Sequence, residues 1–231
     1  MVQIELENSS LGEIVVADFR AASVFKKANI DFCCGGKKTL HQACKEKGLD
    51  LSSIESELRA LQLLSINPTQ NFNDWSVEFL ASFIKNTHHK YVLSALPDLL
   101  IYTDKIAKVH GENHPELVEV ANLFLNINTE LLQHLKKEEE VLFPAISEVV
   151  NSNSLEAKAI IVSEIARMND EHEFAGGAMD KIAELTNHYA IPQDACNTYR
   201  VCLQLLEQFE DDLHVHVHLE NNLIYPKALA L

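Results

Sequence analysis

The sequence predicts an all-α protein with a small helical N-terminal domain followed by an up-down-up-down four-helix bundle. Three observations predict this. The 231 residues include only 7 glycines and 6 prolines, and they are dense in Leu, Ala, Glu and Lys, which favour helices. Apolar residues recur at helical spacing over four long stretches that are joined by short connections. The chain has no run of alternating β-branched residues that would require a sheet.

The N-terminal domain is expected over residues 1–68. It has three short helical stretches, at about 11–28, 36–47 and 53–65. A capping box formed by Ser52 and Glu55 should begin the third stretch. The helical pattern breaks near 66–74, where Pro68 and polar turn formers predict a linker.

The bundle is expected over residues 75–231. Its four amphipathic stretches lie at about 75–109, 115–148, 154–189 and 193–225. Short connections between long helices indicate antiparallel neighbours. Pro97 falls inside the first stretch, so it should kink that helix or split it in two.

Two segments of the bundle repeat one pattern. Each has a histidine and a glutamate four residues apart, then two aliphatic residues, an aromatic residue and a proline: His134, Glu138 and Phe143-Pro144, then His216, Glu220 and Tyr225-Pro226. Residues four apart share one face of a helix, so each segment offers an imidazole and a carboxylate to one point. His89 precedes the first segment by 45 residues, and His172 precedes the second by 44. A pattern that occurs twice indicates a duplicated unit more strongly than a single motif.

These residues predict a metal site inside the bundle, with one histidine from each long helix. Two helices that each present His and Glu supply the ligands of a carboxylate-bridged two-metal site. The donor set suits iron or manganese and does not exclude zinc. Surface histidines on acidic helices are the alternative reading of a single such motif.

Two choices within this pattern need separate arguments. His214 and His218 are also four residues apart on the last helix, but only the pair 216/220 reproduces the spacing to the aromatic-Pro ending. We therefore interpret His214 and His218 as surface residues. The residues alone leave the choice between His88 and His89 open.

Carboxylates one turn earlier extend the same faces. Glu130 precedes His134 by four residues, and Asp212 precedes His216 by four. A metal-bound histidine usually donates its other N–H group to an acceptor. We therefore expect Glu130 and Asp212 to be hydrogen-bond partners of the ligands, or stations for protons and cations; solvated surface acids are the alternative.

Charge and cysteine content limit the function. The net charge is 19 − 34 = −15, which repels nucleic acid and anionic membranes. The sequence has no 18-residue apolar stretch and no secretory signal at its N-terminus, so we expect a cytoplasmic protein. Five cysteines, an odd number, argue against a disulfide framework. Cys196 and Cys202 are interpreted as core thiols.

The adjacent cysteines Cys33 and Cys34 are candidate reactive groups. They precede Gly35-Gly36, and Lys37 follows. A turn that exposes backbone N–H groups beside lysines should lower a thiol pKa. Such thiols could bind a soft metal, receive nitric oxide or form a readily reduced disulfide. A turn with one packed thiol is the structural alternative.

The bundle resembles a hemerythrin-like domain, and the segment Asp31–Leu40 resembles the Cys-Cys-Gly-Gly motif of the Repair of Iron Centres family. The resemblance covers essentially the whole chain. It implies two non-haem iron ions with carboxylate and oxo or hydroxo bridges. It also selects His89 over His88, because the family's first histidine lies eight residues before the proline of Leu-Pro. The implied ligands are His89, His134, Glu138, His172, His216 and Glu220. Oxygen-carrying hemerythrins use more histidine, so oxygen transport is not implied.

The resemblance implies repair of iron–sulfur clusters damaged by oxidants or nitric oxide, with damaged or apo iron–sulfur proteins as partners. Supply of iron from the di-iron site is the favoured route, because the Cys33-Cys34 domain is unnecessary for simple gas reduction. The alternatives are an enzyme that consumes nitric oxide or peroxide and a non-catalytic sensor or iron buffer. A small gas ligand, NO or O₂, and a homodimer are compatible with each reading.

Overall fold

The computed structural model describes residues 6, 8–62 and 72–231. The chain divides into two compact units, one comprising Met1–Leu80 with Val217–Ala230, and the other Ala81–His216 with Leu231. The described residues form helices and no β-strand, and their one β-bridge joins Ser10 and Thr39. The all-α prediction is therefore confirmed.

Four short helices lie in the N-terminal part of the first unit. They are α1 (Leu11–Ala17), α2 (Ala21–Lys27), α3 (Leu40–Lys47) and α4 (Leu51–Gln62), followed by the short turn η2 (Phe72–Asp74). Their apolar faces meet in a core that includes the fully buried Leu11, Phe25 and Leu40. The stretch expected at 11–28 is two helices, because α1 ends at Ala17 and the next residue, Asp18, has an extended backbone. The Asp18 carboxylate binds the Arg20 guanidinium at 2.7 Å just before α2.

The helix starts in this unit follow capping rules, though not at the predicted position. Ser10 and Thr39 each head a complete capping box, before α1 and α3. At α4 the predicted box of Ser52 and Glu55 is wrong. The helix begins at Leu51, and the Asp50 carboxylate accepts hydrogen bonds from the Ser52 N–H at 3.3 Å and from its hydroxyl. Most of the expected linker at 66–74, including Pro68, lies outside the described residues.

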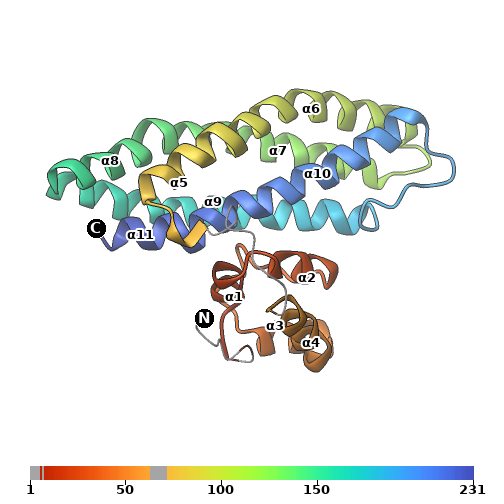
Figure 1. Ribbon diagram of the computed structural model, residues 1–231. Coiled ribbons are helices and arrows are strands. Elements are labelled where there is room, and N and C mark those ends of the chain that lie inside the picture. The colour runs from red at the N-terminus through yellow and green to blue at the C-terminus, as the bar shows by residue number, and fades with distance from the viewer. Residues whose placement is uncertain (1–5, 7, 63–71) are drawn as a thin grey trace. The chain divides into compact units, whose positions relative to one another are not determined.

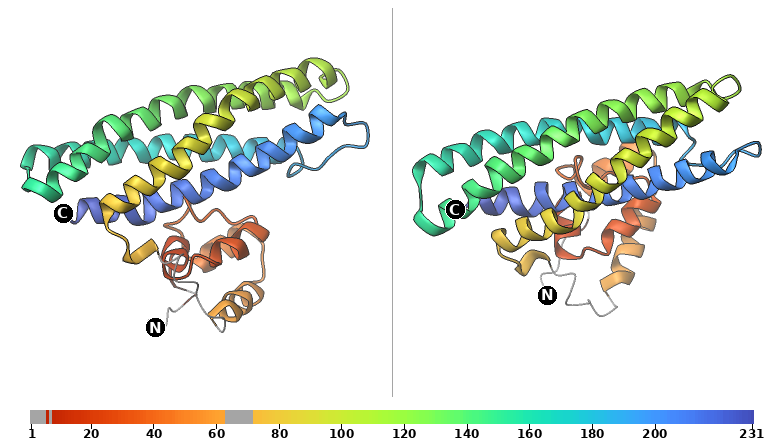
Figure 2. Two further views of the ribbon diagram at one scale, coloured as in Figure 1. Left: turned by 45° about the horizontal axis from the view of Figure 1, so that its top comes forward. Right: turned by 90° about the horizontal axis from the view of Figure 1, so that it is seen from above.

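Four long helices run alongside one another in the second unit, and Figures 1 and 2 show their alternating directions. They are α6 (Lys90–His110), α7 (Glu116–Lys137), α9 (Leu155–Leu185) and α10 (Asn197–Leu219). Two shorter helices, α5 (Val77–Ile84) and α8 (Phe143–Ser152), extend the first and second of these, and α11 (Tyr225–Leu229) follows the fourth. α6 packs on α7, and α9 packs on both α7 and α8. No helix in the described part of the chain is long and apolar enough to cross a bilayer.

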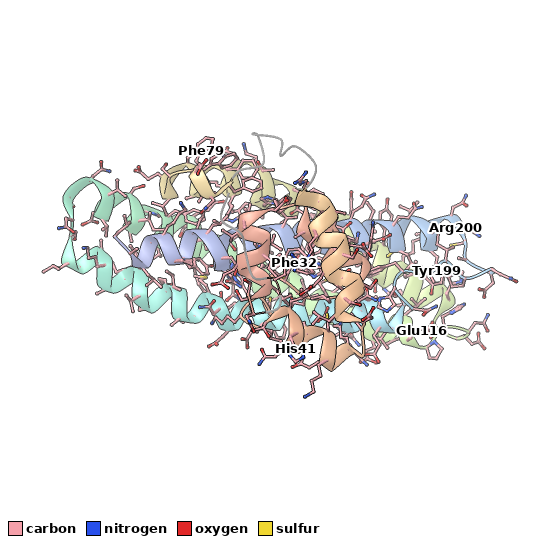
Figure 3. All side chains as sticks on the ribbon, turned by 60° about the horizontal axis from the view of Figure 1, so that its bottom comes forward. Phe32, His41, Phe79, Glu116, Tyr199 and Arg200 are labelled. Carbon is pink, nitrogen blue, oxygen red and sulfur yellow. The ribbon has the colours of Figure 1, made fainter. Side chains whose placement is uncertain are left out.

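Large apolar side chains fill the bundle between these helices. Phe124 of α7 and Phe209 of α10 are both fully buried and meet edge to face, with ring centroids 5.4 Å apart. Such a pair adds about 0.5–1.5 kcal/mol beyond the burial of its surface. The first turns of α7 and α10 lie at one end of the bundle, where Figure 3 labels Glu116, Tyr199 and Arg200.

Candidate metal centre

Three π-helical turns interrupt the long helices, and each contains a predicted ligand. They are η3 (Lys85–His89), η4 (Glu138–Leu142) and η5 (Glu220–Ile224). In η4 the N–H of Phe143 donates to the carbonyl of Glu138, five residues earlier, and η5 repeats this bond between Tyr225 and Glu220. The proline after each aromatic residue lacks an N–H and would clash with a carbonyl four residues back. The wider turn accommodates that proline, which gives a physical reason for the aromatic-Pro ending of the repeat.

Pro97 does not divide the first long stretch. α6 continues through it, and the interruption lies at Lys85–His89. Of the two outcomes expected at Pro97, the split is therefore wrong, and the kink stays a prediction. π-Turns often occur at functional sites because they re-aim side chains within a helix, and here the turn ends at a predicted ligand.

Glu138 lies between two of the predicted histidines. Its Oε2 atom is 3.3 Å from His89 Nε2 and 3.5 Å from His134 Nε2, and the side chain is 0 % exposed. A buried carboxylate is stable only when hydrogen bonds, a paired charge or a metal ion compensate its lost hydration. Glu138 therefore presents one carboxylate oxygen to two imidazole nitrogens inside the bundle.

The other two predicted histidines complete this arrangement. His172 of α9 faces His134, with 3.1 Å between their Nε2 atoms. His216 of α10 lies beside His89, with ring centroids 5.1 Å apart, and its ligand atom is within 4.8 Å of those of His89 and Glu138. The second unit therefore brings together two histidine pairs, with Glu138 between them.

Glu220 stands on the continuation of the helix that carries His216. It begins η5, four residues after His216, and its side chain is 0 % exposed. Glu138 has the same relation to His134 on the second long helix. The helical spacing of the repeat is thus preserved in both segments.

Two carboxylates that the sequence did not predict fix the imidazole rings. Glu139 Oε1 lies 2.9 Å from His89 Nδ1, and Glu171 Oε2 lies 2.8 Å from His134 Nδ1. A carboxylate accepts a hydrogen bond, so Nδ1 carries the proton and the Nε2 lone pair faces the cluster. Glu171 also pairs with Lys137.

These contacts stabilise the ionised form of both Glu139 and Glu171. The hydrogen bond from His134, helped by Lys137, lowers the pKa of Glu171 to about 2. Burial alone would raise the pKa of Glu139, but the contacts with Lys85 and His89 outweigh it and lower the pKa. Both side chains therefore remain anionic acceptors at neutral pH. Neither helical periodicity nor spacing could identify them, because each binds a histidine on a different helix.

The expected hydrogen-bond partners of the ligands need correction. Glu130 is exposed, and the partner of His134 is Glu171 in its place. Asp212 does bind a histidine, but it is His88, with Oδ1 2.9 Å from Nδ1. A shared face within one helix did not predict these contacts, because the partners come from neighbouring helices.

The histidines that were alternatives to the predicted ligands, His88, His214 and His218, have different neighbours from His89 and His216. His88 stacks on His216 at 5.5 Å, while its neighbour His89 points Nε2 at Glu138. His218 is buried against Phe19 and Phe32, and burial lowers its pKa to about 4. The interpretation of His218 as a surface residue is therefore wrong. His214 is half-buried and belongs to a different cluster of side chains.

The donor chemistry of the cluster fits iron. Imidazole nitrogen with carboxylate oxygen is a borderline-to-hard set that suits iron, manganese and zinc. The Glu138 carboxylate could balance the charge of a buried cation, and Glu139 and Glu171 lie behind the histidines, where carboxylates commonly tune bound metals.

The Cys33-Cys34 segment is built around the side chain of Asp31. The Asp31 carboxylate accepts hydrogen bonds from the N–H groups of Cys33 at 2.9 Å, Cys34 at 3.1 Å and Gly35 at 2.7 Å. A Cβ added to Gly35 would lie 2.9 Å from the Asp31 carbonyl oxygen, so the motif requires glycine there. The two sulfur atoms are 3.9 Å apart and do not form a disulfide.

The expectation of a lowered thiol pKa in this turn is wrong for Cys33. The hydrogen bond to Cys34, burial and the nearby Asp31 carboxylate raise the Cys33 pKa well above its ordinary value. Cys202 is a core thiol as predicted, but Cys196 is exposed just before α10. The Cys196 Sγ atom lies 3.1 Å from His110 Nε2, which is the main reason that its pKa is lowered to about 7.

The four-helix bundle and its buried His/Glu cluster define a hemerythrin-like cation-binding protein. Residues 85–228 match the hemerythrin HHE cation binding domain, and residues 7–62 match ScdA_N, a domain of unknown function (DUF542). With both domains in this order, the chain belongs to the Repair of Iron Centres family.

Curated relatives support that assignment over nearly the full length. The chain is 35% identical over 226 residues to an iron-sulfur cluster repair protein YtfE from Yersinia pestis (strain Pestoides F), covering 98% of this chain and 99% of the relative. The YtfE protein of Pectobacterium atrosepticum is also 35% identical over 226 residues, covering 96% of this chain and 97% of the relative.

Proposed function

We propose that the protein binds two iron ions in the bundle and supplies iron for the repair of iron–sulfur clusters damaged by oxidative or nitrosative stress. The proposed ligands are His89, His134, Glu138, His172, His216 and Glu220. The observation that carries this proposal is Glu138, buried between His89 and His134 at 3.3 and 3.5 Å. The relatives' printed name, iron-sulfur cluster repair protein, supports the biological role.

The ligand residues have separate tasks in this proposal. Glu138 would bridge the two ions, and Glu220 would provide the second carboxylate by the symmetry of the repeat. His89 and His134 are held by Glu139 and Glu171, so each presents an Nε2 lone pair without needing to reorient. When bound, iron supplies a redox-active cation whose charge the buried carboxylates balance.

Iron is the cargo in this reading, and the ligand count fits its release. Six protein ligands shared by two ions leave coordination positions for small molecules. A site that is not saturated by protein can exchange its metal more readily than a closed structural site. Damaged or apo iron–sulfur proteins would receive the iron. A cytoplasmic location, the binding of a small gas and the formation of a homodimer stay predictions.

The first experiment measures iron transfer without oxygen. The iron-loaded protein is mixed with an apo iron–sulfur enzyme, with iron per chain counted before and after. Loss of two irons with recovery of enzyme activity supports donation. Glu138→Ala should load less iron and restore little activity, whereas Glu140→Ala, on the exposed side of the same turn, should behave as the unchanged chain.

Iron retained without recovery of activity would contradict iron donation. Consumption of nitric oxide or peroxide by the iron-loaded protein would then be measured, because the same ligands would serve that chemistry.

We further propose that Cys33 and Cys34 act in repair and not in iron loading. Their sulfur atoms and an Asp31 oxygen lie within 4.8 Å of one another, a geometry that could also accept a soft metal ion during transfer. The double variant Cys33→Ser/Cys34→Ser should bind two irons and restore less cluster activity. Cys202→Ser serves as the matched control for thiol removal. Full repair by the double variant would refute a role for these thiols.

A further inference from the structure

A second group of potential metal ligands lies on α9 and α10, outside the residues proposed to hold iron. Asp180 of α9 and Glu210 and His214 of α10 each offer a ligand atom, and these atoms all lie within 4.8 Å of one another. Glu210 and His214 are one helical turn apart on the same face. Asp180 follows His172 by eight residues, about 12 Å along the helix axis.

The turn after α9 directs a tyrosine to this group at a conformational cost. Asn187, His188 and Tyr189 all have left-handed backbone conformations, with φ of 49°, 55° and 59°. Asparagine tolerates this conformation, but it is unfavourable for histidine and tyrosine. The backbone is held there by hydrogen bonds from the His188 N–H to the Ala183 carbonyl at 2.6 Å and from the Tyr189 N–H to the Thr186 hydroxyl at 3.2 Å.

The Tyr189 side chain is only 7 % exposed, and its hydroxyl is buried. This hydroxyl makes no hydrogen bond of standard geometry with any residue that the structure describes. Burial, the charge of the Glu210 carboxylate and its hydrogen-bonding contact with the phenol raise the Tyr189 pKa, and the charge of Asp180 adds to this, so the phenol lies beside this cluster. A buried hydroxyl that lacks a hydrogen bond of standard geometry usually indicates a water molecule or an ion.

We propose that Asp180, Glu210 and His214, together with the Tyr189 hydroxyl, form a binding site for one divalent first-row metal ion. Two carboxylates balance the charge of the ion, and oxygen with imidazole nitrogen suits Mn²⁺, Fe²⁺ or Zn²⁺. Asp180 is exposed, so an ion can reach the site from solvent. Water molecules complete its coordination, and the ion exchanges readily. This site does not depend on iron donation by the other cluster.

Manganese is a suitable probe, because the six-line electron paramagnetic resonance signal of free Mn²⁺ disappears on binding. The iron-loaded full chain is titrated with Mn²⁺, and iron is counted before and after to detect displacement. The unchanged chain should bind one Mn²⁺ without losing iron. Glu210→Gln should weaken this binding by about tenfold or more, the scale of losses at metal sites.

Glu207→Gln is the matched control. Glu207 lies on the same helix and its charge also acts on Tyr189, but it is outside the ligand cluster. The control should bind Mn²⁺ within about twofold of the unchanged chain, as expected for a residue that is not a ligand. Equal losses in Glu210→Gln and Glu207→Gln would overturn the site, because only a general charge effect would then remain. If the bundle fails to load iron, the test still applies to the iron-free chain. The site then requires that Glu210→Gln bind fewer Mn²⁺ ions per chain than the unchanged chain, and that Glu207→Gln show no such loss.

Tyr189→Phe tests the phenol with a side chain of the same shape. Its Mn²⁺ affinity should fall severalfold, while its thermal stability without Mn²⁺ should change little, because the substitution removes a buried hydroxyl that has no hydrogen bond of standard geometry. Unchanged Mn²⁺ affinity would overturn the assignment of the phenol as part of the site.

Discussion

Replacing Glu171 by glutamine would test whether the carboxylate behind His134 controls metal affinity. Glu171 Oε2 accepts a hydrogen bond from His134 Nδ1 at 2.8 Å, and this bond is the main reason that the pKa of Glu171 falls to about 2. Glu171→Gln keeps the shape of the side chain but removes its charge. His134 then becomes a weaker ligand, because the anion no longer increases the electron density of the ring.

The expected loss follows from this geometry. Removal of a hydrogen-bond partner of a metal-bound histidine reduces metal affinity by about 10–100-fold, or about 1.4–2.7 kcal/mol of binding free energy. The change should reach the upper part of that range, because Lys137 also loses its anionic partner and its positive charge remains near the cation.

Competition with an iron chelator in the absence of oxygen measures this affinity. Glu130→Gln is the control, since it removes the same charge from an exposed position one turn before His134. The control should release iron at the same chelator concentration as the unchanged chain. If Glu171→Gln holds iron as tightly as Glu130→Gln, the carboxylate does not support the ligand and the reasoning is refuted.

Further predictions concern stability and thiol reactivity. Gly177→Ala, at an exposed position inside α9 with nothing within 4 Å of the added Cβ, should raise the free energy of unfolding by about 0.5–1 kcal/mol. Gly12→Ala should lower it, because the added Cβ would lie 2.2 Å from Asn222 Oδ1. In denaturant titrations, a less stable Gly177→Ala would contradict the first prediction, and a Gly12→Ala variant as stable as the unchanged chain would contradict the second. Cys196 should react with iodoacetamide at a rate that rises with pH through a midpoint at about 7, because its pKa is lowered to that value. Burial raises the pKa of Cys202 to about 12 and protects it. His110→Gln should slow the reaction of Cys196 at pH 7, as followed by peptide mass spectrometry; an unchanged rate would show that His110 does not activate the thiol.

The sequence determined the helical fold and the pattern of the metal centre. Low glycine and proline content and helical periodicity predict helices without reference to tertiary contacts. The His-x-x-x-Glu repeat could be recognised because residues four apart necessarily share a helix face. The aromatic-Pro ending was visible as a pattern, but its connection with a π turn emerged only from the backbone hydrogen bonds of Phe143 and Tyr225.

Only the tertiary structure decided which side chains from different helices meet. Glu171 and not Glu130 binds His134, and Asp212 binds His88, because helix rotation and packing set these contacts and leave no fixed spacing in the sequence. The same reason hid the approach of Tyr189 to Asp180 and Glu210, which depends on three left-handed residues after α9. Spacing along one helix is fixed by local backbone geometry, whereas contacts between helices depend on how the whole core packs.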